Sequence, residues 1–518
     1  MEPLFLGIDL STQRLKAVVV NEKLEIIEEI IVDFDKDLPE YGTKNGANVD
    51  PRNPQRITSP VEMWLKAVDV CLQKLSNSTI SIKEIRGISG CAQQHGTVYW
   101  SSDGVDELWK LNSDYTLQEQ LKNGFTVKDS PIWMDSSTTK ECRQFEDCVG
   151  GPEHLSKITG SRAYHRFSGP QILKIFNDAP DVYHATQRIS LISSFLTSLF
   201  TGRIVGIEAS DGNGMNLMDL RTKQWSVELA SLVDVSLIEK LGKVECSEAS
   251  WDIANYYVQR YGFNPSCKVI AFTGDNPSAL VGMGIGPGDI GISLGTSDTV
   301  FLTLDNYTSV LEGHIFVNPS NEDTFMGMLC FKNGSLVRER IRGTRSWHEI
   351  SSILKETPPG NNGNVGFYFD KDEILPNQPS GVVRFDSNGK EVTSFDEKTE
   401  IRAVFEHQCL AKRLYAERMG FTSNDGRLIL TGGASNNTDI QQMLADVFGR
   451  EVFVSDTPEA AALGGAIRAI QVVTGTKEIP NRSPRLAARP NDENVKAYNQ
   501  AIILYRKLHD MMFTMRDQ

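Results

Sequence analysis

A short apolar strand, a polar turn and a returning apolar strand constrain this chain more than any other feature. Residues 4–10 read Leu-Phe-Leu-Gly-Ile-Asp-Leu, and residues 15–20 lead back as a second apolar run. Runs this short around a turn predict a β-hairpin rather than a buried helix. The N–H groups of such a turn can hold polyphosphate oxygens, and its carboxylate, Asp9, can hold magnesium through water. An ordinary hairpin with a polar turn is the alternative.

The same pattern recurs at residues 290–304, where the turn again carries small polar residues. Two hairpins of one design, far apart in one chain, predict two like halves that face each other and clamp one triphosphate between their turns. The residues expected to line the phosphates are Ser11, Thr12 and Gln13 in the first turn and Thr296 and Ser297 in the second. No G-x-x-x-x-G-K-[ST] sequence occurs, so the site is not a Walker A loop.

With these hairpins, Gly-Asp-Asn at 274–276 and Thr-Gly-Gly-Ala-Ser-Asn at 431–436 make the chain resemble the carbohydrate kinases of the actin–hexokinase–chaperone ATPase superfamily. Within that family it looks most like the eukaryotic D-xylulose kinases. Seven stretches, spread over a resemblance from about residue 4 to about residue 500, carry the closer match: 89–96, 161–167, 210–217, 272–277, 311–316, 331–336 and 366–369. The resemblance implies an α/β fold of two ribonuclease H-like (actin-like ATPase) domains, residues 1–282 and 283–518, with a cleft between them.

Asp275 is the candidate catalytic residue. It follows a buried apolar strand at 268–273 and sits in a glycine-containing turn, which is poor for stability and good for chemistry. The resemblance implies that Asp275 accepts the proton of the attacking hydroxyl and that Asp9 holds Mg²⁺. It also implies sugar contacts from Gln94, His95, Trp133, Arg166, Asp275 and Asn276, and nucleotide contacts from Trp347, Gly432, Gly433 and Asn436.

Local sequence leaves other interpretations of these residues open. His95 alone could be a structural hydrogen-bonding group, Trp133 a core residue and Arg166 a solvated charge. A tight turn explains Gly432 and Gly433 as well as contact with adenosine does. The chain also departs from the family pattern: Ser-Ser-Thr at 136–138 replaces an expected arginine, which puts a sugar role for Asp135 in doubt. The usual K-L-x-W reads Lys-Ile-Phe at 174–176.

Length and charge limit the classes of function. A chain of 518 residues has room for two large domains. Its formal net charge of −14 argues against nucleic acid or an anionic membrane as a partner. Eight cysteines without metal-ligand spacing, and no signal-peptide pattern, predict reduced thiols and a cytoplasmic protein. We expect a monomer or homodimer whose partners are a small ketose and ATP.

Several elements are predicted from local pattern. Residues 32–60 read as a long loop on the active-site side or as a lid, and residues 101–130 as a polar excursion over the surface. Ser59 is expected to cap a helix that has Pro60 at its first position and runs to about residue 74. Further helices are expected at 189–200, 403–418 and 460–469, the last two by helical spacing. The glycine-rich run at 286–291 precedes a strand, so it reads as a hinge and not as a dinucleotide site.

The predicted activity is ATP-dependent phosphorylation of D-xylulose at its 5-hydroxyl. A sister kinase for ribulose, glycerol or gluconate would share both hairpins and Asp275, so only the sugar-side residues favour xylulose. A non-catalytic actin-like ATPase is disfavoured because no separate peptide-binding domain is expected and the Gly-Asp-Asn carboxylate would have no use there. A sugar sensor that has lost catalysis is disfavoured because Asp9 and Asp275 are both present.

Overall fold

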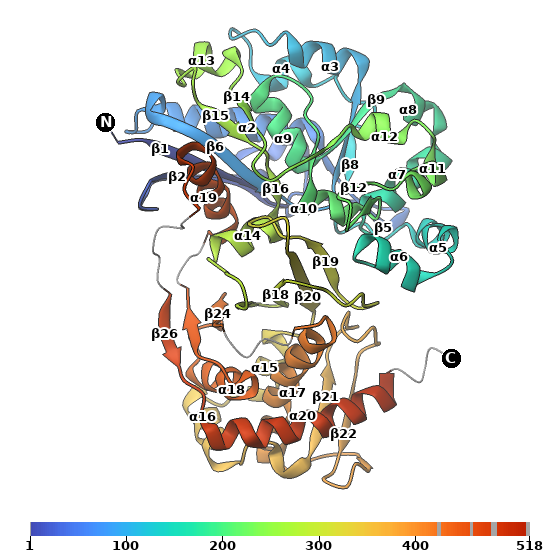
Figure 1. Cartoon of the computed structure of the whole chain (residues 1–518), viewed down its shortest axis with the longest axis vertical. Coiled ribbons are helices and arrows are strands. Elements are labelled where there is room, and N and C mark those ends of the chain that lie inside the picture. Colours follow the sequence, from blue (N-terminus) through green and yellow to red (C-terminus); the bar gives the residue numbers. More distant parts are fainter. Residues whose placement is uncertain (1, 422–425, 456–458, 478–483, 514–518) are drawn as a thin grey trace. The chain divides into compact units, whose positions relative to one another are not determined.

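The computed structural model describes residues 2–421, 426–455, 459–477 and 484–513. It divides into two compact α/β units (Figure 1). The first comprises residues 1–284, 315–323 and 459–482, and the second comprises 285–314, 324–458 and 483–518. The sequence predicted one boundary, at 282/283. The chain divides at 284/285, and two later segments return to the first unit.

The first unit is built on one mixed sheet whose central strand is β1. Strand β1 pairs antiparallel with β2 on one side and parallel with β6 on the other. Every residue of β1 is buried, as expected of a central strand covered on both faces. The strands, in spatial order, are β14 (Ser250–Asp252), β15 (Lys268–Ile270), β6 (Ile85–Ala92), β1 (Leu4–Leu10), β2 (Arg14–Asn21) and β3 (Ile26–Asp33), with β16 (Thr273–Gly274) also paired to β6.

The two faces of this sheet bury different side chains because successive residues of a strand point to opposite faces. Leu6 and Ile8 belong to a core with helices α2 (Val61–Ser76), α9 (Ile192–Thr201) and α13 (Asn255–Tyr261). Phe5 belongs to a second core, formed with helix α19 (Ala460–Thr474).

Helix α19 confirms the predicted helix at 460–469, and it packs on the first sheet although it lies near the end of the chain (Figure 1). Its glycines allow this approach. A Cβ on Gly465 would lie 2.5 Å from the Cα of Gly90, and one on Gly464 would lie 1.9 Å from the carbonyl oxygen of Ser278. The glycine pair that weakens an isolated helix is therefore required by close contact with β6 and helix α14 (Asp275–Gly282).

Two expectations about residues 32–60 are corrected. The segment is not an irregular loop, because β3 extends to Asp33 and is followed by α1 (Phe34–Asp37), η1 (Pro39–Tyr41), β4 (Asn48–Asp50) and β5 (Asn53–Pro60). Ser59 does not cap α2. It lies in β5, where its hydroxyl donates to the carbonyl oxygen of Gly46 at 2.7 Å, and Pro60 occupies the cap position. Gly46 does lie against the first turn, since a Cβ there would be 1.8 Å from the Thr12 oxygen.

The polar stretch 101–130 also contains regular structure, and the expected helix at 189–200 begins only at Ile192, after a strand. The remaining elements of the first unit are η2 (Ile82–Glu84), β7 (Thr97–Ser101), α3 (Ser102–Trp109), α4 (Leu117–Leu121), β8 (Asp129–Pro131), α5 (Thr139–Cys148), α6 (Pro152–Thr159), α7 (Ser168–Asp178), α8 (Pro180–Ala185), β9 (Thr186–Leu191), β10 (Ile207–Glu208), α10 (Ala209–Gly212), η3 (Asn213–Met215), β11 (Met218–Asp219), β12 (Gln224–Trp225), α11 (Val227–Val233), α12 (Leu237–Leu241) and β13 (Val244–Glu245). Residues 315–323, which start within β19 (His314–Val317), are joined to it where Val317 N donates to Asn213 Oδ1 at 2.9 Å.

The second unit repeats the hairpin-centred design. Strand β17 pairs antiparallel with β18 and parallel with β24, as β1 pairs with β2 and β6. The strands of its sheet that belong wholly to this unit are, in order, β20 (Phe325–Phe331), β18 (Asp298–Leu304), β17 (Ile290–Leu294), β24 (Leu428–Thr431), β25 (Val452–Val454) and β26 (Arg485–Ala488).

The helices of the second unit include the predicted 403–418 helix, which is the C-terminal part of a longer, largely buried helix, α17 (Glu397–Arg418). The other elements are α15 (Ser335–Arg342), α16 (Trp347–Glu356), η4 (Asn361–Gly363), α18 (Thr438–Phe448), α20 (Asp492–Phe513) and a small sheet of β21 (Val365–Phe369), β22 (Gly381–Phe385) and β23 (Glu391–Val392).

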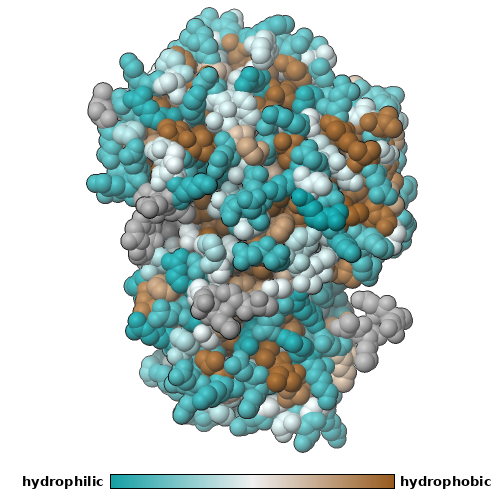
Figure 2. All heavy atoms as spheres, in the orientation of Figure 1, coloured by the Kyte–Doolittle hydropathy of each residue, from teal (hydrophilic) through white to brown (hydrophobic). Residues whose placement is uncertain are grey.

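The face of the molecule in Figure 2 is mostly hydrophilic, with hydrophobic residues in small separate groups. Within the described residues, no helix combines the length and apolar character needed to cross a membrane.

Candidate active site

The first turn holds a buried carboxylate at the centre of its sheet. Asp9 lies near the end of β1, and the turn is closed by a hydrogen bond from Ser11 N to Arg14 O at 3.0 Å. Ser11 Oγ donates to Asp9 Oδ2 at 2.6 Å, and Cys91 Sγ lies 3.5 Å from Asp9 Oδ1. Burial raises the pKa of the Asp9 carboxyl above its ordinary value of 3.8. Lys16 makes its short contact, 2.6 Å, with Glu459, so it leaves Asp9 without a directly bonded cation.

Three parallel strands end together beside this turn. Leu10 of β1 and Gly274 of β16 both pair with Ala92 of β6. The residues that follow these strand ends therefore converge, which brings Asp275 and Gln94 to the same edge of the sheet. Gly274 must lack a side chain here, because a Cβ would lie 2.5 Å from Gln94 Cγ and 2.7 Å from Asp211 Oδ1.

Asp275 is held at the start of α14 by its neighbour. Asn276 donates to Asp275 Oδ1 from its backbone N at 2.8 Å and from Nδ2 at 3.0 Å. Asn276 Nδ2 also donates to Gln94 Oε1 at 3.1 Å, and Gln94 Nε2 donates to Asp211 Oδ1 at 3.4 Å. The structure thus brings together three of the residues predicted to bind sugar, Gln94, Asp275 and Asn276. It adds Asp211, which lies in the 210–217 stretch that carries the family resemblance but had no predicted role.

The electrostatics of this group are unusual because its acids form no ion pair with any cation in the part of the chain that the structure describes. Burial, followed by the negative charges of Asp9 and Asp211, raises the pKa of the Asp275 carboxyl from 3.8 to about 7. Burial and the charge of Glu208 raise the pKa of Asp211 to about 7 as well, although Ser193 donates to its carboxylate at 2.5 Å. A carboxylate that titrates near neutrality is suited to accepting a proton.

His95 lies in the loop after β6 in the left-handed backbone region, with a φ of 73°. Its ring packs on Phe167 with centroids 4.6 Å apart, and Nδ1 lies 2.9 Å from the Gly214 oxygen. The ring is therefore held in one orientation by groups from two separate segments.

Trp133 and Arg166 form a second cluster with the first turn. Trp133 is 36% exposed, which excludes the interpretation that it is a core residue, and its Nε1 donates to Thr12 Oγ1 at 2.8 Å. The guanidinium carbon of Arg166 lies 5.4 Å from the Trp133 ring centre and 4.7 Å from that of Tyr164. The residues predicted to bind sugar are thus physically linked to a residue predicted to bind phosphate.

Asp135 has a structural explanation. Its carboxylate is buried and accepts from Ile57 N at 2.9 Å, Ser137 N at 2.9 Å, Ser137 Oγ at 2.7 Å and Gln171 Nε2 at 2.8 Å. Four donors thus satisfy one buried carboxylate and join three segments of the chain, around residues 57, 135–137 and 171. This agrees with the absence of the arginine that follows this aspartate in the family pattern.

The second unit has a pocket of about 850 Å³ beside its own turn. Four of the residues predicted to contact the nucleotide line this pocket: Thr296, Trp347, Gly433 and Asn436. A fifth, Gly432, directly precedes Gly433 in the chain. Gly432 has a φ of +86°, and a Cβ there would lie 2.5 Å from the Leu294 oxygen, so the turn between β24 and α18 requires glycine. Ser297 is exposed and is not among the lining residues.

Comparison with known proteins decides the family. The N-terminal domain model of the FGGY family of carbohydrate kinases matches residues 4–111 and 121–282, and the C-terminal domain model matches residues 290–471. The chain belongs to the FGGY family of carbohydrate kinases. The predicted fold, two actin-like α/β domains, is confirmed with it.

Close relatives are named for one sugar. The chain is 46% identical to a xylulose kinase of Rattus norvegicus, over 98% of this chain and 97% of that protein. It is also 46% identical to xylulose kinase 2 of Arabidopsis thaliana, over 90% and 87% of the two chains.

Solved structures show the same fold at low sequence identity. A xylulose kinase from Rhodospirillum rubrum has a TM-score of 0.80 and 14% identity, covering 99% of this chain and 100% of its own. A gluconate kinase from Lactobacillus acidophilus has a TM-score of 0.78 and 15% identity, covering 99% and 98%. Since kinases named for xylulose and for gluconate share this fold, the fold alone does not identify the substrate.

Proposed function

We propose that this FGGY kinase transfers the γ-phosphoryl group of ATP to the 5-hydroxyl of D-xylulose. The observation that carries the proposal is the Asp275 carboxylate, fixed where three strands end and with a pKa of about 7. The 46% identity to named xylulose kinases over nearly the whole chain supports the choice of sugar.

In the proposed reaction, Asp275 accepts the proton of the attacking hydroxyl or orients that hydroxyl toward the phosphorus. Asn276 fixes the orientation of the carboxylate through its two hydrogen bonds. Gln94, His95, Arg166 and Asn276 hold the sugar hydroxyls, and Trp133 packs against the sugar carbons. The fork of the Arg166 guanidinium suits two hydroxyls at a fixed separation, and its stacking between two aromatic rings limits its movement.

The nucleotide half of the reaction is assigned to both turns and to the second unit's pocket. Ser11, Thr12, Gln13, Thr296 and Ser297 would donate to phosphate oxygens. Trp347, Gly432, Gly433 and Asn436 would contact the adenosine. No Cβ-sized obstacle lies within 4 Å of Gly433, so a flat ring could approach its backbone directly.

A magnesium ion fits the chemistry of the first site. Asp9 offers buried carboxylate oxygens, which Mg²⁺ prefers, and its negative charge contributes to the raised pKa of Asp275. Across the described residues, no three His, Cys, Asp or Glu side chains cluster as a metal site, which agrees with an ion held by few protein ligands together with water and phosphate. When bound, Mg²⁺ would neutralise phosphate charge during transfer.

We also propose a cytoplasmic location and a monomer or homodimer. Five of the eight cysteines are buried, as expected of structural thiols in a reducing compartment.

The test is ADP release by the purified protein with D-xylulose, D-ribulose, glycerol and D-gluconate, each with and without Mg²⁺. We expect the highest kcat/KM with D-xylulose and no turnover without the metal. A higher kcat/KM for another sugar would transfer the proposal to that sugar. ADP release that no sugar stimulates would overturn the assignment as a sugar kinase.

A further inference from the structure

Helix α15 is attached directly to the second turn. Gly334, its cap residue, donates from N to the Thr296 oxygen at 3.1 Å, and Ser335 N donates to the Gly295 oxygen at 2.9 Å. A Cβ on Gly334 would lie 2.7 Å from both carbonyl oxygens. The first residues of α15 are thus fixed against the turn that we assign to phosphate binding, and Ser335 and Arg338 line the same pocket as Gly295 and Thr296.

Beneath this turn lies a buried cluster with more positive than negative charge. Asp298, Arg338 and Lys412 are all 3% exposed or less. Lys412 Nζ lies 2.8 Å from Asp298 Oδ2, and Arg338 Nη1 lies 3.5 Å from the same oxygen. Asp298 Oδ1 accepts from Gly295 N at 3.2 Å, which ties the cluster to the turn itself. One carboxylate therefore faces two cations.

The neighbouring buried carboxylates have other partners. Glu406 is paired with Arg402 at 2.9 Å. Glu373 accepts four N–H groups, from Lys332 N, Asn333 N, Asn333 Nδ2 and Ile374 N. A buried excess of positive charge is costly unless an anion approaches it.

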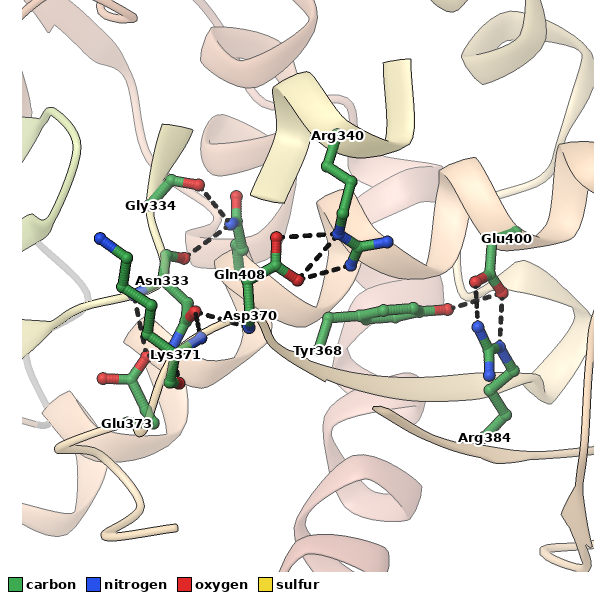
Figure 3. Close-up of polar contacts among 10 residues, drawn as sticks. All are labelled: Asn333, Gly334, Arg340, Tyr368, Asp370, Lys371, Glu373, Arg384, Glu400 and Gln408. Carbon is green, nitrogen blue, oxygen red and sulfur yellow. Dashed lines mark hydrogen bonds and ion pairs between the residues drawn. The ribbon is translucent and has the colours of Figure 1, made fainter. Parts of the chain in front are cut away.

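The guanidinium of Arg338 is held in place with one nitrogen unused. Its Nη1 donates to Gln408 Oε1. Gln408 Nε2 in turn donates to the carbonyl oxygens of Asn333 at 2.9 Å and Gly334 at 3.0 Å (Figure 3). Within the described part of the chain, Arg338 Nη2 has no hydrogen-bond partner. Buried donors are nearly always paired, so an unpaired one on a pocket wall points to a missing ligand.

We propose that Arg338, supported by Lys412, binds a phosphate group of the nucleotide held in this pocket. The proposal rests on the proposed function, because it takes the pocket to be the nucleotide site. A polyphosphate would supply the anion that balances the cluster and the acceptor for Nη2. An arginine is suited to this because its planar fork matches phosphate oxygens.

The experiment is a titration of ADP and of adenosine, by calorimetry, into the wild-type protein, Arg338→Met and Arg338→Lys. Arg340→Met is the matched control, because Arg340 lies on the same helix but is exposed and paired with Asp370 (Figure 3). We expect the ADP Kd to rise at least about 10-fold in Arg338→Met and about 3- to 10-fold in Arg338→Lys, which keeps the charge but loses the fork. The adenosine Kd should be unchanged in both, and Arg340→Met should match the wild type with either ligand.

The outcomes separate the two proposals. A wild-type protein that binds neither ADP nor adenosine would overturn the proposed function, and this inference with it. Normal nucleotide binding by the wild type with an unchanged ADP Kd in either Arg338 variant would overturn the inference alone. Equal losses for ADP and adenosine would show that Arg338 only maintains the fold. If Arg338→Met fails to fold, Arg338→Lys decides by the same criteria.

Discussion

Asp275→Asn should make the protein less active and more stable. If Asp275 accepts the proton, the amide cannot replace it, and kcat should fall by about 10²- to 10⁴-fold. The stability effect follows from the pKa, which is 3.8 for an ordinary aspartate and about 7 here. At ~1.4 kcal/mol per pKa unit, this difference corresponds to ~4 kcal/mol. Because Asp275 remains partly exposed to solvent, we halve this value to ~2 kcal/mol.

The difference in stability between Asp275→Asn and the wild type depends on pH. Between pH 4 and 7 the folded protein keeps a proton on Asp275 that the unfolded chain releases, so the free energy of unfolding falls as pH rises through this interval. Asparagine has no such dependence. The variant should therefore be more stable than the wild type at pH 8, with a gain on the order of 3 °C in Tm, and the difference should vanish near pH 4.

The assay is thermal unfolding at pH 8 and pH 4 together with steady-state kinetics. Wild-type kcat/KM for D-xylulose should decline as pH falls below about 7, because protonated Asp275 cannot accept a proton. Asp135→Asn is the matched control: that carboxylate accepts four donors, so the same substitution should cost about 1–3 kcal/mol of stability. An Asp275→Asn protein that keeps wild-type kcat, or that is less stable at pH 8, would refute the reasoning.

Four further substitutions test the rest of the site. Asp9→Ala and Thr296→Val should each raise the KM for ATP and for Mg²⁺ while calorimetry still detects xylulose binding, and equal losses of sugar and nucleotide affinity would contradict the assignment. Arg166→Ala should raise the KM for xylulose about 5- to 150-fold at a nearly unchanged KM for ATP, since a lost buried hydrogen bond costs about 1–3 kcal/mol. Trp133→Phe removes the N–H that donates to Thr12 Oγ1 but keeps an aromatic surface for Arg166. It should therefore raise the KM for ATP more than the KM for xylulose. A larger effect on the KM for xylulose would assign Trp133 to the sugar alone.

Local signals account for what could be predicted from sequence. Each hairpin lies within about 20 residues, and each glycine-containing strand end is recognisable from its composition. The sequence alone therefore places Asp9, Asp275 and the 431–436 turn at the ends of strands. The opposite case is residues 53–60, whose prolines and asparagines read as loop. They form a strand because Thr58 pairs with Asn48 on one side and Pro131 on the other, the second of which lies far along the chain.

Long-range contacts explain what was missed. Nothing near residues 460–474 indicates that they pack against strand β1, and the Lys16–Glu459 contact joins residues 443 positions apart. Arg338 and Lys412 sit in helices with many charged residues and read as surface side chains. Only the fold shows that both side chains are buried and contact the same carboxylate, Asp298.

The two units differ in the charge that they leave unbalanced, and this difference matches the ligands proposed for them. In the first, Asp9, Asp211 and Asp275 lie in a largely buried region, and none of them forms an ion pair with a described residue. That region therefore favours a neutral polyol, a proton or a metal cation over an anion. In the second, the buried cluster of Arg338, Lys412 and Asp298 beneath the turn carries one more positive than negative charge, so that pocket favours a polyphosphate. A protein of net charge −14 repels ATP on average, and a local cation excess that is buried, where salt screens it little, is a physical means of overcoming that repulsion at one place.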